Sequence, residues 1–491
     1  MYMSQYDDFQ TDAVPEGWCL AKLEDICTPP QYGWTTSANK GSTGLRLLRT
    51  SDISSGTVDW SAVPGCVKEP DAPDKYRLRS GDIVISRAGS VGISHVIKNP
   101  PEAIFASYLI RFRPIPPIET DLLGFFLQSP LYWGEVTNQV SGITIGNVNA
   151  SKLKRMVIPL PPLAEQKRIV AKVEELLARV NTARERLDKV PKIMKRFRQA
   201  VLAAACSGKL TEDWREAHPD VEPAAALLER IRAQRRGNPS RRQYATGNVD
   251  DIHIPESWVW ITTGGLCDCI VPNRDKPKTF SGNIPWITLP DFGDALEIGE
   301  NLSGLGLTWE ETVRYRARVI PAGSVVMSCI GRFGIAAVLT CDAVINQQLH
   351  AFLVPSELNA KYLVYAIRTQ DEAMNEMATS TTIAYLNKTK CNSVPVPLAP
   401  IMEQREIVHR VEALFKLADA IEERVDMARE SANKLTQSIL VKAFRGELVP
   451  TEAELARLEG RSYEPASVLL ERIRKERGRE KLQSKGKRSR R

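Results

Sequence analysis

Two long segments of the chain carry apolar residues at alternating steps of four and three residues. The first stripe runs from Ile169 to Ala204 and the second from Ile407 to Ile439, with charged residues between the apolar positions. This spacing makes one face of a helix apolar and is typical of a left-handed coiled coil. A helix of about 40 residues is roughly 60 Å long and has no means of burying such a stripe alone. We therefore expect the two helices to pair with each other in an antiparallel arrangement.

Prolines and glycines mark the ends of these predicted helices. Pro162 and Pro400 precede the two stripes, and Gly208 and Gly446 follow them, which are the usual start and stop signals of a helix. Pro191 lies inside the first stripe. Because proline lacks a backbone N–H and clashes with the preceding turn, we expect a kink or a break there. The second stripe has no proline at the matching place, and its helix is expected to be continuous.

The second half of the chain repeats the first. Residues 159–210 match residues 397–448 without a gap, and shorter blocks before and after them match in the same order. So many ordered matches at nearly one offset indicate a tandem duplication. The shorter blocks are Pro15–Trp18 with Pro255–Trp258, Gly81–Ser86 with Gly323–Ser328, and Glu222–Ala224 with Glu464–Ala466.

Each repeat begins with a front part of mixed character. Runs such as Gly81–Ser86 and Ile104–Phe112 are rich in β-branched or aromatic residues and are predicted to be strands. The expected fold is α+β: two mixed α/β domains and two long helices paired as an antiparallel coiled coil, related by a pseudo-two-fold axis. The expected segments are 1–158 and 255–396 for the front parts, 159–210 and 397–448 for the long helices, 211–254 for a linker with a short helix, and 449–491 for a short helix and a basic tail.

Composition and charge narrow the possible functions. With 491 residues, 43% of them hydrophobic, the chain can form several cores, and its polar start favours a cytosolic protein. Nine cysteines without framework spacing are interpreted as reduced packing residues. The net charge of +7 arises from the segment Arg474–Arg491, with ten basic and two acidic residues. This tail either adds affinity for phosphates or is a solvated segment of little consequence.

Catalytic and metal-binding motifs are incomplete in this sequence. Asn99–Glu102 approaches the motif of adenine methyltransferases but ends in Glu, and is interpreted as a turn. Gly208 with Lys209 does not complete a phosphate-binding loop and is better explained as a helix end. Asp52 and Asp291 lack a catalytic neighbourhood and are expected to cap turns. We therefore predict no catalysis, no metal and no bound cofactor.

Polar side chains near glycine-containing turns are candidates for contacting DNA, since Arg pairs with guanine edges and Asn or Gln with adenine edges. Neither front part is basic as a whole, so the chain alone is expected to bind DNA weakly and to need partners. The alternative for every candidate is a structural role in its loop. The candidates are Arg87, Ser90, Thr144, Asn147 and Asn149 in the first front part, and Arg332, Asn346, Gln347, Gln348, Thr382, Tyr385 and Asn387 in the second.

Two motifs that occur once in each repeat resemble the specificity subunit of type I restriction–modification enzymes. One begins the helices, Ile158–Gln166 and Val396–Gln404, and the other ends them, Gln199–Leu210 and Gln437–Leu448. The resemblance runs from Pro15 to about Arg474 and departs from the family pattern at Pro191.

The resemblance implies a function for each part of the chain. Each front part would be a target recognition domain that reads one half of a split, asymmetric site in double-stranded DNA. The paired helices would set the spacer and help to dock two modification subunits, which carry S-adenosylmethionine chemistry on adenine. Restriction subunits that use ATP and Mg would join the complex. Partner docking is the hypothesis for the residues that begin the helices, with helix capping as the alternative: Glu165, Gln166, Glu403 and Gln404.

Two other functions are compatible with the repeat. A stand-alone DNA-binding regulator would bind its site tightly without partners. A protein–protein adaptor would not touch DNA, and substitutions at Arg87 and Arg332 would leave its activity unchanged.

Overall fold

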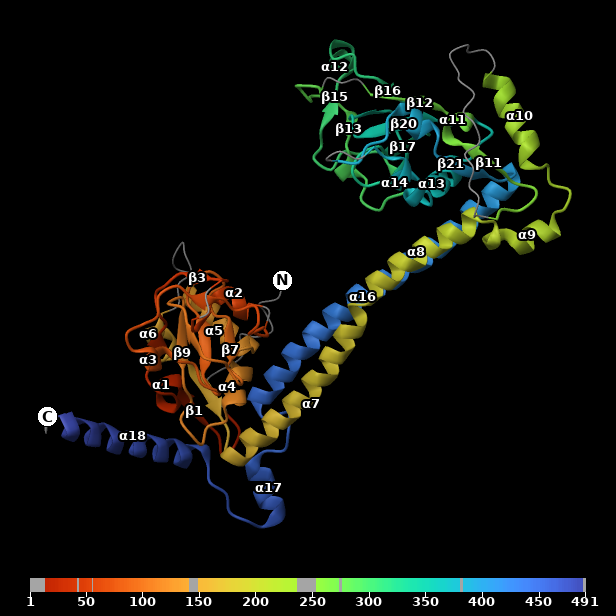
Figure 1. Ribbon diagram of the computed structural model, residues 1–491. Helices are drawn as coiled ribbons and strands as arrows, with labels where there is room; N and C mark the ends of the chain where they lie inside the picture. The colour runs from red at the N-terminus through yellow and green to blue at the C-terminus, as the bar shows by residue number, and fades with distance from the viewer. Residues whose placement is uncertain are drawn as a thin grey trace. The chain divides into compact units, whose positions relative to one another are not determined.

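The computed structural model describes residues 14–41, 44–54, 56–140, 149–235, 253–272, 276–379 and 383–488 (Figure 1). The chain forms two compact units. Unit 1 comprises residues 1–188 and 427–491, and unit 2 comprises residues 189–426. Each unit therefore contains one front part, called here the first head or the second head, together with portions of both long helical segments.

The first head contains two four-stranded sheets, with strand orders β2-β9-β6-β7 and β3-β5-β4-β8, and a separate pair of β1 with β10. Its strands are β1 (Cys19–Lys22), β2 (Gln31–Tyr32), β3 (Ala38–Asn39), β4 (Arg46–Leu48), β5 (Gly65–Cys66), β6 (Ile83–Ser86), β7 (Ser94–Val96), β8 (Ala103–Phe105), β9 (Leu109–Phe112) and β10 (Val157–Leu160). Its helices are α1 (Leu23–Ile26), α2 (Thr50–Ile53), α3 (Pro73–Tyr76), α4 (Thr120–Phe126), α5 (Pro130–Val140) and α6 (Ala150–Leu153).

The second head repeats this construction with strand orders β12-β20-β17-β18-β14, β15-β13-β19-β16 and β11-β21. Its strands are β11 (Val259–Thr262), β12 (Asp268–Ile270), β13 (Ile284–Ile287), β14 (Glu297–Ile298), β15 (Gly306–Leu307), β16 (Val319–Ile320), β17 (Val325–Ser328), β18 (Ala336–Leu339), β19 (Ala343–Ile345), β20 (Leu349–Leu353) and β21 (Pro395–Leu398). Its helices are α11 (Thr263–Leu266), η2 (Leu289–Asp291), α12 (Trp309–Arg314), α13 (Ala360–Arg368), α14 (Asp371–Met377) and α15 (Lys388–Asn392).

The strand predicted over Ile104–Phe112 is two strands in the structure. β8 ends at Phe105 and β9 begins at Leu109. Between them the chain turns, and the N–H of Leu109 donates to the carbonyl of Ala106. The two strands belong to different sheets. An apolar run in the sequence does not show where the chain passes from one sheet to the other.

The long helical segments follow the prediction closely. They form α7 (Leu163–Leu187), α8 (Val190–Cys206) and α16 (Ile401–Arg445), followed by η1 (Lys209–Thr211), α9 (Glu212–Ala217) and α10 (Ala224–Arg235) after the first and by α17 (Glu452–Glu459) and α18 (Ala466–Arg488) after the second. Gly208 and Gly446 have left-handed φ angles of 79° and 72° just past the helix ends, as expected for terminating glycines.

The first helix is interrupted just before Pro191. α7 ends at Leu187 and α8 begins at Val190, whereas α16 is continuous over 45 residues. Asp188 and Lys189 keep right-handed helical dihedral angles, so the interruption lies in the hydrogen bonding of the helix. A missing proline donor has this effect.

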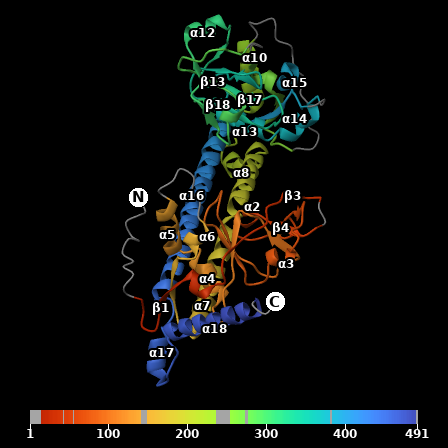
Figure 2. The same cartoon turned by 90° about the vertical axis from the view of Figure 1, so that its left-hand side faces the viewer.

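The helices pair in antiparallel fashion within each unit (Figures 1 and 2). In unit 1, Arg184 contacts Asn433 while Asp188, further along α7, contacts Arg429, which lies earlier in α16. In unit 2, Arg198 contacts Glu422 while Asp213 contacts Arg410.

One position of each apolar stripe is exposed. Ala183 is exposed, and Leu435 is 51% exposed. Polar groups occupy this part of the seam in unit 1, where one Arg184 nitrogen lies 2.8 Å from both the Asn433 and the Thr436 side-chain oxygens.

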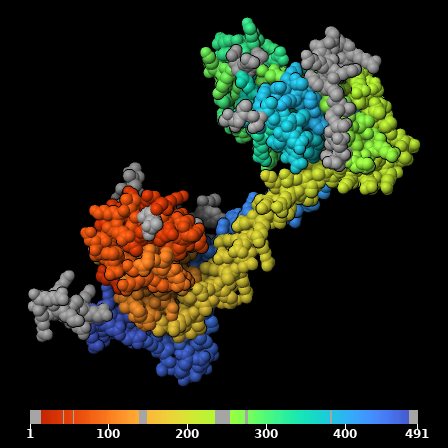
Figure 3. All heavy atoms as spheres, viewed as in Figure 1, coloured from red at the N-terminus to blue at the C-terminus, as the bar shows by residue number. Residues whose placement is uncertain are grey.

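Each head shares its core with helices from the other repeat. In unit 1 the core contains Phe126 of the first head, Val173 of α7, Phe444 of α16 and Leu469 of α18. The space-filling view shows the C-terminal helices packed against the first head (Figure 3). In unit 2, Val201 of α8 and Ile231 of α10 join the second head. The helices after each long helical segment, such as α10 and α18, thus contribute to the cores of the compact units.

Candidate nucleic-acid interface

A cluster of polar and aromatic side chains lies at the end of β6 in the first head, and we call it the first rim. It comprises Tyr32, Arg87, Ser90, Tyr108 and Asn149. The N–H of Arg87 donates to the carbonyl of Tyr108 at 2.9 Å. The guanidinium carbon of Arg87 lies 5.0 Å from the centroid of the Tyr32 ring, a cation–π distance.

Hydrogen bonds from neighbouring loops hold the first rim together. The Tyr32 hydroxyl accepts the N–H of Ala150 at 3.1 Å. Asn149 caps α6, its side-chain oxygen accepting the N–H of Lys152 at 2.9 Å. Ser90 is exposed, and its carbonyl accepts the hydroxyl of Ser86. The rim therefore joins four segments of the chain.

Two rim residues, Tyr32 and Tyr108, were missed by the sequence prediction. Their side chains are 39% and 57% exposed. An exposed tyrosine has no distinctive local pattern, because its exposure depends on how β2 and β9 pair. The β2–β9 register places Tyr32 opposite Ile110, two residues from Tyr108. Only the sheet topology brings these side chains near Arg87.

The second head has a corresponding cluster, the second rim, made of Arg332, Asn346, Gln347, Gln348, Tyr385 and Asn387. The N–H of Cys329 donates to the carbonyl of Gln348 at 2.9 Å, and the N–H of Gly331 donates to the carbonyl of Ala384 at 2.8 Å. These bonds join the segments that carry Arg332, Gln347 and Tyr385. Arg332, Gln347 and Gln348 are exposed.

The remaining second-rim residues hold the local backbone. The Asn346 side chain accepts the N–H of Gln348 at 3.1 Å. Asn387 caps α15 by accepting the N–H of Lys390 at 2.9 Å, as Asn149 does for α6. Thr144, Asn147 and Thr382 lie outside the described residues.

The two rims place different side chains at equivalent positions. β6 pairs with β9 so that Ser86 lies opposite Leu109, and β17 pairs with β20 so that Ser328 lies opposite Leu349. The next pair outward is Arg87 with Tyr108 in the first rim and Cys329 with Gln348 in the second. The same backbone framework therefore carries a cation and an exposed phenol in the first head, and a buried thiol and an exposed amide in the second.

The four residues that begin the helices are buried and fully engaged within their own units. Glu165 accepts hydrogen bonds from the indole nitrogen of Trp18 at 2.9 Å and from the N–H of Glu452 at 2.8 Å. Gln166 donates to the carbonyl of Pro161 at 2.8 Å. Burial raises the pKa of Glu165, and these hydrogen bonds oppose that shift.

Unit 2 repeats the arrangement with different supporting residues. Glu403 accepts hydrogen bonds from the indole nitrogen of Trp258 and from the hydroxyl of Thr211, both at 2.8 Å, and from Arg215. Gln404 donates to the carbonyl of Ala399 at 2.8 Å. Glu165, Gln166, Glu403 and Gln404 are at most 1% exposed. We therefore assign these four residues a structural role within their own units and do not propose them as direct contacts with partner subunits.

The other residues weighed for chemistry have local roles. Asp52 accepts the N–H of Arg49 at 2.8 Å, and Asp291 accepts the N–H of Thr288 at 2.7 Å, so both cap turns as predicted. Asn99 has a positive φ of 46°, consistent with the predicted turn. Among the described residues there is no cluster of three or more His, Cys, Asp or Glu side chains able to hold a metal ion.

All nine cysteines are free thiols, and seven of them are buried, in agreement with the packing role predicted for them. Within the described part of the chain, none of the helices combines the length and apolar character needed to span a membrane.

The family of the chain follows from its match to a family model. The model described as "Type I restriction modification DNA specificity domain" matches residues 15–192 and 255–426. These ranges cover more than half of the chain and begin at the two Pro-Glu-X-Trp blocks. The chain belongs to this family. It is a non-catalytic DNA-specificity subunit of a type I restriction–modification system.

Full-length relatives agree with this membership. The chain is 30% identical to the type I restriction enzyme EcoKI specificity subunit of Escherichia coli K12, with 94% of this chain and 96% of the relative covered. It is 31% identical to the StySPI specificity subunit of Salmonella potsdam, with the same coverage. It is 32% identical to the EcoBI specificity subunit of Escherichia coli, with 95% and 93% covered.

Two solved structures share the fold of this specificity subunit. One, from work on complex assembly and conformational transition of the type I R-M system, has a TM-score of 0.62 at 22% identity and covers 89% of this chain and 99% of that chain. The HsdS subunit from Thermoanaerobacter tengcongensis has a TM-score of 0.51 at 22% identity, with 88% and 98% covered.

Proposed function

We propose that each head of this specificity subunit reads one half of a bipartite, asymmetric site in double-stranded DNA, through its rim. The observation that carries this proposal is the pair of equivalent positions at the end of β6 and β17. Arg87 and Tyr108 occupy them in the first head, and the buried Cys329 and the exposed Gln348 occupy them in the second. Two heads that expose different side chains on one framework, such as Tyr108 and Gln348, are suited to reading two different half-sites.

The chemistry of the rims suggests different base preferences. A guanidinium donates two parallel hydrogen bonds to the O6 and N7 atoms of guanine in the major groove. Arg87 is supported on the Tyr32 ring and suits such a contact. The second rim is rich in amides, which pair with the edge of adenine through N6 and N7. We therefore expect guanine in the first half-site and adenine in the second.

Partner subunits would supply the chemistry of the complex. Two modification subunits would carry S-adenosylmethionine, and restriction subunits would use ATP and Mg. Exposed apolar side chains on the helices support docking of such partners, because large apolar groups in contact with water often mark interfaces. They are Met427, Leu435 and Leu458 in unit 1 and Ile193 and Leu417 in unit 2.

A map of N6-methyladenine across the host genome, with and without the gene for this chain, tests the proposal. Loss of methylation at one split motif is expected, and the motif gives both half-sites. The deletion strain is then complemented with the Arg87→Gln chain or the Gln348→Ala chain. Each variant should change the recognised bases in one half of the methylated motif and leave the other half unchanged. A motif that is independent of the gene, or unchanged by both variants, would favour the adaptor or regulator alternative.

A further inference from the structure

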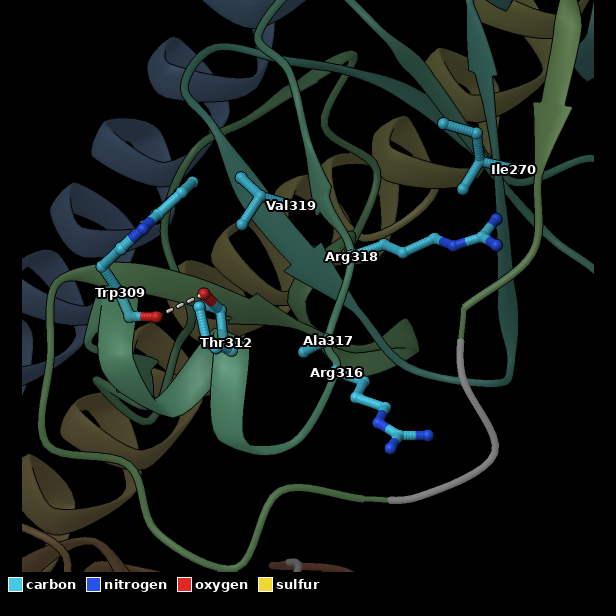
Figure 4. Close-up of a pocket in the computed structure, with 8 residues that line it drawn as sticks. Ile270, Trp309, Thr312, Arg316, Ala317, Arg318 and Val319 are labelled. Atoms are coloured by element: carbon cyan, nitrogen blue, oxygen red, sulfur yellow. Dashed lines mark hydrogen bonds between the residues drawn. The ribbon is translucent and has the colours of Figure 1, made fainter.

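α12 and the segment after it carry a dense group of basic side chains outside the second rim. Arg314, Arg316 and Arg318 are all exposed. Arg316 and Arg318 line a shallow hollow of about 470 Å³ together with Trp309 and Val319. In Figure 4 the Arg316 and Arg318 guanidinium groups lie on one side of this hollow and Trp309 on the other. Trp309 is 66% exposed.

The carboxylate nearest to these arginines along the chain, that of Glu311, is turned inward. It accepts hydrogen bonds from the N–H of Thr308 at 2.9 Å and from the hydroxyl of Ser281 at 2.9 Å. Hydrogen bonds from Thr279 and from the backbone of Thr308 lower the pKa of Glu311 to about 2. Its charge is thus committed to the capping box of α12, and Glu310 is the exposed carboxylate of this helix.

Two lysines extend the basic surface. Lys276 and Lys278 are exposed on the segment before β13. That segment is held against α12 by Ser281, which contacts Glu311, and by Thr279, whose hydroxyl lies 3.1 Å from the hydroxyl of Tyr315. Five exposed basic side chains therefore lie on α12, on the segment after it and on the segment held against it. Because α12 itself has one exposed carboxylate, the positive charge of these segments favours the binding of an anion.

The backbone at Arg316 adds to the case. Arg316 follows the end of α12 with a positive φ of 49°, in the position where a helix usually has glycine. The N–H of Ala317 donates to the carbonyl of Thr312 at 2.8 Å, which closes the turn. Arg316 therefore occupies a left-handed backbone position that would favour glycine, which has no side chain.

The equivalent place in the first head is arranged differently. Arg77 pairs with Ile104 in the first head, and Val319 pairs with Val344 in the second. Arg77 and Val319 are therefore equivalent, and the residues before them, Tyr76 and Arg318, correspond to each other. The Tyr76 ring packs 5.4 Å from the ring of Trp34. Arg77 forms ion pairs with Asp74 and Glu102.

The second head differs at this place in the pairing of its cations. Arg314 and Arg318 form no ion pair with the described residues, whereas Arg77 of the first head is paired.

We infer that the α12 surface binds the sugar–phosphate backbone of duplex DNA next to the half-site contacted by the second head, without reading bases. Arg314, Arg316 and Arg318 face the phosphates, and the Trp309 ring packs on a deoxyribose. Contacts to phosphate and sugar position a protein on the duplex but carry no sequence information. The inference rests on the proposed function, since it requires the second head to lie on DNA.

The salt dependence of binding tests this inference directly. The full chain is assembled with its modification subunits, and its affinity for a labelled duplex containing the mapped motif is measured from about 50 to about 200 mM KCl. Each lost phosphate contact reduces the slope of log affinity against log salt by about 0.9. The Arg314→Gln/Arg318→Gln double variant should therefore have a slope less steep by about 1.8. Its deficit relative to the wild type should grow roughly twelvefold from the high to the low salt concentration.

Three controls make the result specific. Preference for the motif over duplexes with one changed base pair should stay at the wild-type level in the double variant. Glu310→Gln removes a charge of opposite sign from the same helix and should bind equally well or more tightly. Trp309→Ala should weaken binding at every salt concentration without changing the slope. Thermal unfolding curves that match the wild type show that each variant is folded.

Other outcomes would overturn the inference. A folded double variant with the wild-type salt slope would mean that these arginines do not touch phosphates. Loss of co-purifying modification subunits, with the slope retained, would mean that the surface docks a protein. Failure of the proposed function is a different result, in which the wild-type complex has no preference for the motif over a scrambled duplex.

Discussion

The indole nitrogen of Trp18 donates a hydrogen bond of 2.9 Å to Glu165 in the first turn of α7. The same bond, 2.8 Å long, joins Trp258 to Glu403 in unit 2. Both carboxylates are at most 1% exposed. The bond ties the segment that leads into each head to the start of the long helix that follows the head. It explains why the Trp and the Glu-Gln pair occur together in each repeat.

Loss of either carboxylate should destabilise its own unit. Glu165→Ala leaves the Trp18 indole and the N–H of Glu452 buried without an acceptor, which costs about 1–3 kcal/mol. Glu403→Ala should cost more, because it also removes the partner of Thr211 and Arg215. Urea unfolding analysed as two transitions, one for each unit, measures the loss.

A surface carboxylate on the same helix provides the control. Glu174 is exposed on α7, and Glu174→Ala should stay within about 0.5 kcal/mol of the wild type. An equal effect of the Glu165 and Glu174 substitutions would argue against the importance of the Trp18 bond.

Acid should destabilise unit 2 through His350. This side chain is 1% exposed on β20, and burial, aided by Lys388, lowers its pKa to about 4. The neutral form is therefore favoured in the folded state, and the unfolded chain takes up a proton below its ordinary pKa of about 6.5. Stability is fully present above that value and is lost as the pH falls toward 4.

The expected loss is about 2 kcal/mol between pH 7 and pH 5. His350→Gln should remove this dependence from the unfolding transition of unit 2, although the variant is less stable at neutral pH. A variant with the same pH profile as the wild type would show that other groups cause the acid sensitivity. His95 of the first head has a pKa lowered by burial as well, so the two transitions must be followed separately.

Features with a local cause could be predicted from the sequence. The apolar stripes depend on the spacing of residues along the chain. The helix ends at the glycines and the interruption before Pro191 depend on the backbone properties of single residues. The repeat also predicted the antiparallel pairing within each unit. The exposure of Leu435 could not be predicted, because its spacing is the same as that of the buried residues of the stripe.

The rims and the junctions depend on long-range packing and were harder to predict. Arg87 was a candidate, but its support by Tyr32 requires β2 and β6 to flank β9. Glu165 begins a helix, and a surface role was a reasonable expectation for a charged residue there. Its burial follows from Trp18, which is far from it in sequence.

Arg198 should contribute to the helix pair of unit 2. Its guanidinium donates to Glu422 at 3.0 and 2.8 Å and to Asp419 at 2.5 Å, with its side chain 26% exposed. Because the pair is partly exposed, Arg198→Ala should cost only about 1 kcal/mol. A double-mutant cycle with Glu422→Ala should give a coupling energy of about 0.5–1 kcal/mol that decreases at high salt. Additive effects would mean that the ion pair does not stabilise the helices.

Arg87 and Tyr32 should act together on one half of the DNA site. Arg87→Gln should reduce discrimination at one base pair of the first half-site by about 1–3 kcal/mol, roughly tenfold to a hundredfold. Tyr32→Leu removes the ring that supports Arg87 and should have a smaller effect on the same base pair. Tyr32→Phe keeps the ring and should stay near the wild type.

Binding of the assembled complex to duplexes with single changes in each half-site measures these effects. The two Tyr32 variants separate the positioning of Arg87 from the stability of unit 1. If the effect came only from losing the hydrogen bond between the Tyr32 hydroxyl and the N–H of Ala150, Tyr32→Phe would show it as well. Discrimination in the second half-site should be unchanged in all three variants. Equal losses in both halves for Arg87→Gln would mean that Arg87 contributes general affinity rather than base reading, and would remove it from the first rim's recognition set.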